Sequence, residues 1–267
     1  MTSFVTYEKS DNVVTLTLNA PQERNAIGSR EACEQIAQAA DAVNGDPDVN
    51  AVVLTGAGTA FCSGGNIKKI GDTSGFARGA TPALTRENYR LGIQRAITAL
   101  WNVEVPMIAA VNGPAIGLGC DLACTCDLRI AADCATFAES FLKIGLVPGD
   151  GGAWFLPRIV GFAKAAEMAF TAEVLNAADA LAAGLVSKVV PADRLLDEAQ
   201  GLARRIAAQP RVALRLTKRL LRESQHARLG ELLELSAAFQ AIVHESEDHA
   251  EALAALREKR APRFTGR

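Results

Sequence analysis

Two apolar segments, each followed directly by a glycine-rich turn, constrain the fold of this chain most strongly. Residues 51–56 lead into GAGTAFCSGGN, and residues 106–111 lead into NGPAIGLGCD. Apolar runs of this length are typical of strands buried on both faces, and small residues after them let the backbone approach a ligand closely. The pattern predicts an α/β fold with candidate binding turns at two strand ends.

The segments around these strands complete an alternating pattern. Residues 4–19 predict two short strands joined by a turn, and a helix capped by Ser29 follows and ends near Gly45. Residues 71–85 are rich in Gly, Thr and Ser, which predicts a mobile loop. A helix over residues 85–102 is expected next.

The last third of the chain has a different pattern. A strand is expected at 127–133 and helices from Gly151 onward, whereas past about residue 190 only helical patterns occur. We therefore predict a core of residues 1–195 and a C-terminal helical region of residues 196–267. Its wide apolar stripe favours packing on a neighbouring subunit or, equally, on the same subunit.

Composition excludes several classes of function. The chain has 267 residues, a net charge of −2 and no apolar run of membrane-spanning length, so we expect a cytoplasmic protein with no nucleic acid or membrane as partner. Its six cysteines lack the spacing and neighbouring histidines of a zinc site, which predicts reduced, mostly buried thiols and no metal.

The candidate chemistry depends on a carboxylate and on backbone donors. All three histidines lie in the C-terminal third, so a general base is expected to be a carboxylate. Asp121 follows the second glycine-rich turn, where a helix beginning near Gly117 would present free N–H groups. Two such turns can form an oxyanion hole, although the glycines of either turn alone are explained by a tight bend.

Six blocks in this order resemble the crotonase superfamily, the enoyl-CoA hydratase/isomerase family. The blocks are LNAPQERNAIG, GAGTAFCSGGNIKKI, VPMIAAVNGPAIGLGCDLACTCDLRIAAD, KIGLVPGDGGAWFLPRIVG, ALAAGLVSKVV and REKRAPRF. The resemblance implies an α/β spiral of repeated ββα units with a C-terminal helical region for trimerisation. It also implies a homotrimer or a homohexamer built as a dimer of trimers. The ligand would be an acyl-CoA thioester, with no separate cofactor because coenzyme A is part of the substrate.

The resemblance also assigns residues to the site. The backbones of Gly65 and Leu118 would supply the two oxyanion N–H groups. Phe239 and Lys259 would reach the coenzyme A of a neighbouring subunit. The residues expected along the coenzyme A of the same subunit are Arg24, Ala26, Ile27, Ser63, Asn66 and Ile67.

Hydratases of this family use two glutamates, and this chain departs from that pattern. Asp121 stands at the first glutamate position, whereas the second falls on Phe141, an apolar wall. Glu139, two residues earlier, would replace it only after a register shift, and a surface or ion-paired glutamate is the favoured interpretation. Asp150 is a second candidate carboxylate, or the N-cap of the following helix.

We therefore expect an acyl-CoA enzyme that forms a thioester enolate, with crotonyl-CoA hydration slow or absent. Asp150 and the aromatic residues Phe141 and Trp154 motivate one alternative, a hydrolase of a β-dicarbonyl or aromatic acyl-CoA. Phe141 motivates the other, an oligomer that binds a coenzyme A ligand without catalysis.

Overall fold

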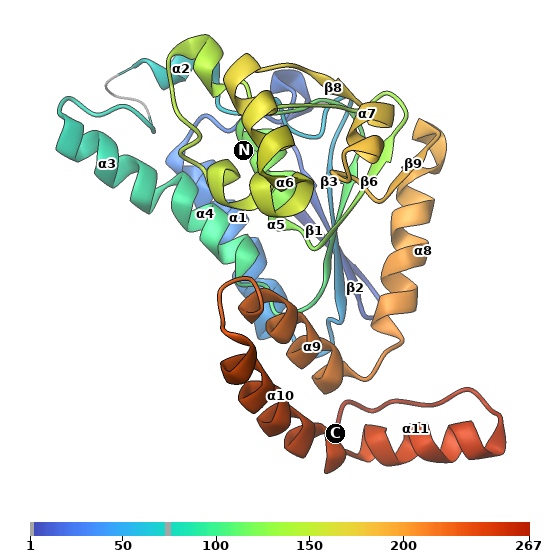
Figure 1. The fold of residues 1–267 in the computed structure, drawn as a ribbon. Coiled ribbons are helices and arrows are strands. Elements are labelled where there is room, and N and C mark those ends of the chain that lie inside the picture. The colour runs from blue at the N-terminus through green and yellow to red at the C-terminus, as the bar shows by residue number, and fades with distance from the viewer. Residues whose placement is uncertain (1–2, 73–75) are drawn as a thin grey trace.

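A six-stranded sheet forms the centre of the computed structural model, which describes residues 3–72 and 76–267 (Figure 1). β1 and β2 are antiparallel, and every following neighbour in the sheet is parallel. In order across the sheet the strands are β1 (Val5–Ser10), β2 (Val13–Leu18), β3 (Ala51–Gly56), β4 (Met107–Val111), β6 (Leu128–Ala132) and β9 (Lys188–Val190). A smaller sheet contains β5 (Ala115–Ile116), β7 (Thr136–Ala138) and β8 (Leu175–Asn176).

Helices cover both faces of the large sheet and form the end of the described chain. They are α1 (Arg30–Gly45), α2 (Ile67–Ile70), α3 (Pro82–Leu91), α4 (Ile93–Trp101), α5 (Leu118–Thr125), α6 (Gly152–Thr171), α7 (Ala177–Ala182), α8 (Leu195–Ala207), α9 (Arg211–Glu223), α10 (Leu229–His244) and α11 (Glu247–Glu258). Short 3₁₀ turns occur at η1 (Pro21–Glu23), η2 (Phe141–Ile144) and η3 (Ala192–Arg194). The predicted α/β class and the helical C-terminal part are confirmed.

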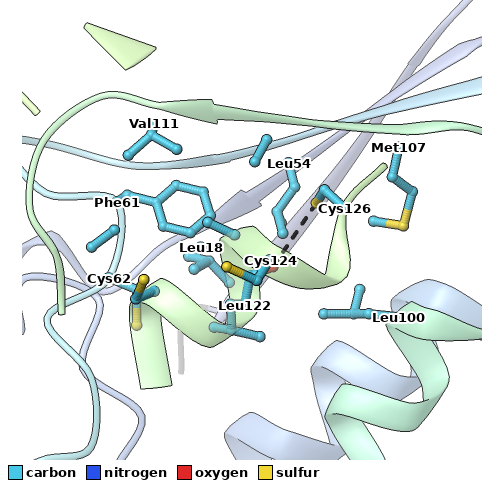
Figure 2. Close-up of a cluster of buried hydrophobic side chains, with 14 of the residues drawn as sticks. Leu18, Leu54, Phe61, Cys62, Leu100, Met107, Val111, Leu122, Cys124 and Cys126 are labelled. Atoms are coloured by element: carbon cyan, nitrogen blue, oxygen red, sulfur yellow. Dashed lines mark hydrogen bonds between the residues drawn. The ribbon is translucent and has the colours of Figure 1, made fainter. Parts of the chain in front are cut away.

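The central strands are buried on both faces because their side chains alternate between two cores. On β3, Val52 and Leu54 pack in the core of α1, α4 and α5, whereas Val53 packs in the core of α8. Figure 2 shows Leu54 in the larger core with Phe61 and Leu122. This double burial explains why the strands read as continuous apolar runs.

The cysteines behave as small core residues. All six are free, and only Cys134 is exposed. Cys62, Cys124 and Cys126 lie in the larger core beside Leu122 (Figure 2). The prediction of mostly buried cysteines is confirmed, and the C-x-C spacing reflects packing, whereas the reduced state stays a prediction.

Most element boundaries agree with the sequence prediction. The opening hairpin is present, and the Ser29 hydroxyl accepts a hydrogen bond from the N–H of Ala32 at 3.1 Å. The predicted extent of the loop at 71–85 is wrong at its end, because α3 already begins at Pro82. The hydroxyl of Thr81 caps that helix. Residues 73–75 lie outside the described residues.

The helix predicted over residues 85–102 is two helices. α3 ends at Leu91 and α4 begins at Ile93, with Gly92 between them. A Cβ at Gly92 would lie 2.7 Å from the carbonyl oxygen of Asn88, so only glycine allows this approach without a shift.

The predicted boundary between residues 195 and 196 falls at the start of α8. This helix packs on the sheet through Leu195, Ala199 and Ala203, so it belongs to the core in three dimensions. Farther along the chain, α10 and α11 extend away from the sheet and its covering helices, and we call these two helices the arm (Figure 1).

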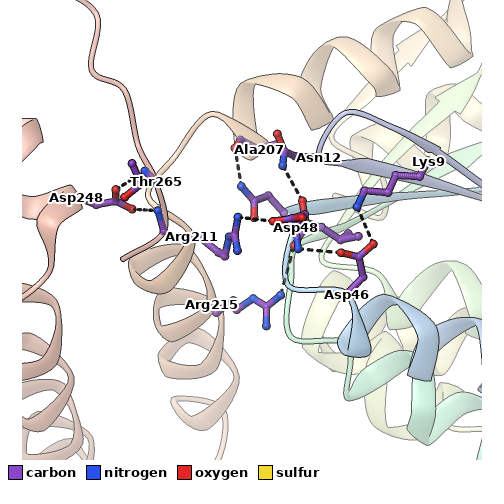
Figure 3. A network of polar contacts seen from close by, with 12 residues as sticks. Lys9, Asn12, Asp46, Asp48, Ala207, Arg211, Arg215, Asp248 and Thr265 are labelled. Carbon is purple, nitrogen blue, oxygen red and sulfur yellow. Dashed lines mark hydrogen bonds and ion pairs between the residues drawn. The ribbon is translucent and has the colours of Figure 1, made fainter.

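Ion pairs attach α9 to the body. Lys218 donates to Asp127 at 2.7 Å and to the carbonyl of Val105 at 2.6 Å. Arg222 contacts the same aspartate at 3.0 Å. At the N-terminal end of α9, Arg211 forms an ion pair with Asp48 (Figure 3). The arm therefore begins from a helix held by charged side chains.

In the part of the chain that the structure describes, no helix combines the length and the apolar character needed to cross a membrane. The cytoplasmic location stays a prediction.

We predict that Gly119→Ala lowers the free energy of unfolding by about 1–3 kcal/mol. A Cβ at residue 119 would overlap the carbonyl oxygen of Cys62 and lie 2.8 Å from its carbonyl carbon. Gly201→Ala is the matched control, because nothing lies within 4 Å of the added methyl in α8. It should raise stability by roughly 0.5–1 kcal/mol. Urea unfolding followed by circular dichroism measures both, and equal effects would contradict the packing described.

Candidate active site

Two turns meet beyond the carboxyl ends of β3 and β4. Cys62 and Ala115 form a parallel β-bridge. In it the Cys62 N–H donates to the Pro114 carbonyl oxygen, and the Ile116 N–H donates to the Cys62 carbonyl oxygen. Gly64 approaches the second turn so closely that a Cβ on it would lie 2.6 Å from the Ile116 carbonyl oxygen. This contact brings the two glycine-rich segments of the sequence together.

The predicted oxyanion residues lie at this meeting point. Leu118 is the first residue of α5, so its N–H has no acceptor within the helix. Ile27 and Gly65 form a second β-bridge. Its hydrogen bonds run from the Ile27 N–H to the Gly64 carbonyl and from the Asn66 N–H to the Ile27 carbonyl, so the Gly65 N–H takes no part. Two such donors can stabilise a negative oxygen that develops on a bound carbonyl.

A cavity of about 190 Å³ opens beside these donors. It is lined by six of the predicted site residues, which are Ser63, Gly65, Ile67, Leu118, Phe141 and Asp150. The sequence analysis missed other wall residues, including Phe76, Tyr89, Ile93 and Leu146. Nothing in the apolar pattern of that region distinguishes a cavity wall from core packing.

Asp150 is the carboxyl group on the cavity wall. Its side chain is 6% exposed, and its buried Oδ1 has no hydrogen-bond partner among the described residues. Burial raises the pKa of Asp150 to about 7. A carboxyl group with this pKa can accept and return a proton near neutral pH.

The alternative role of Asp150 as a helix N-cap is wrong. Gly151, with a φ of 108°, holds the N-cap position of α6, and no side chain caps this helix. The Asp150 carboxyl is therefore not used to satisfy the free N–H groups of the helix.

Asp121 and Glu139 form a buried carboxyl pair. Asp121 lies in the first turn of α5, and Glu139 follows β7. The two side chains are 0% and 2% exposed. Burial raises the pKa of Asp121 well above its usual value, and the charge of Glu139 raises it further. Burial also raises the pKa of Glu139, to about 7.

The favoured interpretation of Glu139 as a surface or ion-paired residue is therefore wrong. β5 and β7 are parallel, with Ile116 opposite Ala138, and the Gly117 N–H donates to the Ala138 carbonyl at 2.7 Å. Because both carboxyl groups follow neighbouring strands, they meet without a register shift. The strand at 136–138 was not predicted from the sequence, and it is the signal that would have revealed the pair.

Phe141 and Trp154 have different surroundings. Phe141 lies on the cavity wall, and its ring would be 3.7 Å from a Cβ at Gly117. It is therefore the apolar wall predicted from the sequence. Trp154 packs against Trp101 with ring centroids 5.1 Å apart and is not among the residues that line the cavity. Of the two aromatic residues that motivated a hydrolase, Phe141 lines the cavity and Trp154 does not.

The residues predicted along coenzyme A divide into two groups. Arg24 is exposed, and Asn66 caps α2 and donates to Glu23 at 3.3 Å. Ile27 is completely buried in the core, and Ala26 is 9% exposed. Because the Ile27 side chain lies inside the core, only the backbone of this residue could contact a ligand, and its place along coenzyme A stays a prediction.

Phe239 and Lys259 lie on the arm, in α10 and at the end of α11. In Figure 1 this arm is at the opposite end of the molecule from α2 and α6. Phe239 is buried beneath Arg219, whose guanidinium lies 5.6 Å from the ring centroid. A single chain therefore does not bring these two residues to the cavity, and their role toward a neighbouring subunit stays a prediction.

Within residues 3–72 and 76–267, no group of three or more His, Cys, Asp or Glu side chains has the arrangement needed to hold a metal ion. The charge of Asp150 raises the pKa of both Asp121 and Glu139, so the three carboxyl groups near α6 interact electrostatically.

The chain is similar, over nearly its whole length, to proteins of one enzyme family. Residues 8–267 match the family model described as enoyl-CoA hydratase/isomerase. A Mycobacterium bovis protein named "Probable enoyl-CoA hydratase echA8" is 38% identical over 264 residues, covering 97% of each chain. The 1,2-epoxyphenylacetyl-CoA isomerase of Escherichia coli is 35% identical over 267 residues, covering 100% of each chain.

A solved structure supports the same conclusion about the fold. The enoyl-CoA hydratase from Bacillus anthracis superposes with a TM-score of 0.91 at 29% sequence identity, covering 99% of this chain and 100% of that chain. The crotonase fold predicted from the six sequence blocks is confirmed.

We predict that Asp150→Asn makes stability less dependent on pH. The pKa of Asp150 is about 7 in the fold and near 3.8 in an unfolded chain, so the folded protein binds this proton more tightly. The contribution of Asp150 to the free energy of unfolding should therefore be most favourable below pH 4 and fall as the pH rises toward 7, by at most roughly 4 kcal/mol.

Asparagine carries no charge, so the variant should be more stable than the parent at pH 8 and similar at pH 4. Denaturant unfolding across this pH range measures the difference. Asp41→Asn, at an exposed position of α1, is the control and should follow the parent. A variant that is less stable at pH 8 would contradict the assigned burial cost.

Proposed function

Because the chain belongs to the enoyl-CoA hydratase/isomerase family, we propose that it is an acyl-CoA isomerase that moves a double bond through a thioester enolate. Asp150 is the group that transfers the proton. One observation carries this proposal: the Asp150 carboxyl lines the cavity that Gly65 and Leu118 also line.

The proposed reaction needs one base and two backbone donors. The ionised Asp150 removes a proton from the carbon next to the thioester carbonyl of a 3-enoyl-CoA. The electron pair moves onto the carbonyl oxygen, where the N–H groups of Gly65 and Leu118 stabilise the negative charge. Asp150 then returns the proton to the carbon at the far end of the double bond, which leaves a 2-enoyl-CoA and regenerates the base.

The cavity wall favours isomerisation over hydration. Hydration of a double bond requires one group to activate water and a second to protonate the carbon. Among the described wall residues Asp150 is the carboxyl group, while Asp121 and Glu139 lie behind the wall and Phe141 is apolar.

The exposed side chains near the cavity are suited to coenzyme A. We place Arg24, Ser63, Asn66 and Ile67 along it, with Ala26 contributing through its backbone. In this proposal Phe239 and Lys259 come from the arm of a second copy within a trimer or a dimer of trimers. Leu229, Leu233, Ile242 and Leu256 are exposed on that arm, which supports its burial against another subunit.

We predict that the protein isomerises 3-enoyl-CoA and hydrates crotonyl-CoA slowly or not at all. Asp150→Asn should lower kcat for isomerisation by about 10²- to 10⁴-fold with little change in KM, because it removes the proton-transfer group and leaves the oxyanion donors. Asp41→Asn is the matched control and should retain the parent rate. Absorbance assays of the conjugated thioester measure both reactions.

Other outcomes would replace this function. Rapid hydration of crotonyl-CoA that persists in Asp150→Ala would contradict the role of Asp150. Free acid and coenzyme A detected by mass spectrometry would identify a hydrolase. Binding without turnover across a panel of acyl-CoA thioesters would identify a noncatalytic oligomer.

We predict a mass in sedimentation equilibrium of three or six times the 28.1 kDa of one chain. Leu233→Glu should shift the population to smaller species, because it places a charge on the apolar face of α10 that a subunit would cover. Glu234→Gln, on the same helix, is the control. A parent protein that sediments as a monomer would contradict the assembly.

A further inference from the structure

The Asp121–Glu139 pair lies where three segments meet. Asp121 comes from α5, Glu139 from the chain after β7, and Gly152 begins α6. A Cβ at residue 152 would overlap Asp121 Oδ1 and lie 2.8 Å from Glu139 Oε1. Both carboxyl groups are therefore directed at the same point of the α6 backbone, and a glycine is required there.

Nothing else in the described structure neutralises this pair. All four carboxyl oxygens are buried, and none is in an ion pair with a lysine, arginine or histidine among the described residues; the Gly152 N–H is the backbone donor that lowers the pKa of Asp121. The titratable groups that act on the pair are Asp150, from the segment before α6, and the thiols of Cys120 and Cys124, from α5. Lys143 of η2 lines the cavity and forms no ion pair with either carboxyl among the described residues.

Two buried negative charges side by side, with a backbone N–H but no cation to offset them, would be strongly unfavourable. A single proton solves this problem, because a neutral carboxylic acid can donate a hydrogen bond to an ionised one. The proton converts two acceptors into a donor and an acceptor. It also joins α5, which begins at the oxyanion residue Leu118, to the segment that follows β7.

We propose that Glu139 is a positioning residue that shares one proton with Asp121, so that Asp121 stays a neutral acid behind Asp150. This inference rests on the proposed function, in which Asp150 alone exchanges a proton with substrate. The shared proton keeps the charge of the pair on Glu139 rather than on Asp121, and it links the start of α5 to the segment after β7. Asp121 then influences the charge of Asp150 and the position of Leu118, and it does not contact the substrate.

Infrared spectroscopy tests the proton without using activity. The experiment uses Asp150→Asn protein at pH 8, in which Asp150 contributes no carboxyl signal. We expect the carbonyl stretch of a protonated carboxylic acid that shifts when Asp and Glu carboxyls are labelled with ¹³C. Asp121→Asn introduced into this background should remove the band. Absence of the band in folded Asp150→Asn protein would overturn the inference, even if Asp150 proves to be the catalytic base.

The pH dependence of kcat tests the consequence for catalysis. In Glu139→Gln the amide can donate to an ionised Asp121, so Asp121 loses its proton at lower pH. We expect activity at pH 8 to fall at least about tenfold, with KM changed less than about twofold, because the alkaline limb of the profile moves to lower pH. The acid limb, which reports Asp150, should remain.

The double variant Asp121→Asn with Glu139→Gln separates positioning from catalysis. Its two amides can hydrogen bond without any charge, so the alkaline limb should disappear and activity at pH 8 should recover relative to Glu139→Gln. A folded double variant as inactive as Asp150→Asn would overturn the inference, because Asp121 would then act on substrate itself. A Glu139→Gln profile identical to that of the parent would overturn it as well.

Discussion

The contact between α5 and the turn after β3 is the constraint on which the candidate site depends. Gly119 lies directly against the Cys62 carbonyl, and the bridge between Cys62 and Ala115 fixes the two turns relative to each other. Neither turn alone could place two backbone donors at one cavity. The large core beneath them, formed around β3 and β4, makes this arrangement rigid because both strands are buried on both faces.

The same rigid core creates a second property, an environment that disfavours charge. Asp121, Glu139 and Asp150 all lie in or beside it, and burial is the largest cause of the raised pKa of each carboxyl. A fold selected for stability alone would not keep three acids there. The free-energy cost of burying these carboxyl groups is consistent with a site that needs acids able to exchange a proton near neutral pH.

The difference between Glu139 and Phe141 shows where sequence reasoning succeeds and where it fails. Counting from the PGDGG segment placed Phe141 at an apolar wall, and it lines the cavity. The same counting could not place Glu139, because β7 is a three-residue strand with no periodic pattern. Its direction depends on pairing with β5, a contact between distant parts of the chain. Similarly, only the fold shows that Ile27 is a core residue, held by a bridge to Gly65, whereas Arg24 nearby is exposed.

The amino-acid sequence by itself determined the α/β class, the hairpin, the buried strands, the glycine turns and the family, because these depend on local patterns and on ordered motifs. Tertiary structure alone decided which carboxyl groups meet, which one lines the cavity, and that α8 belongs to the core. The physical reason is that burial and charge interaction depend on distances between segments far apart in the chain. Asp121 and Asp150 are both acids beside glycines in the sequence, yet only the fold places one behind the wall and the other on it.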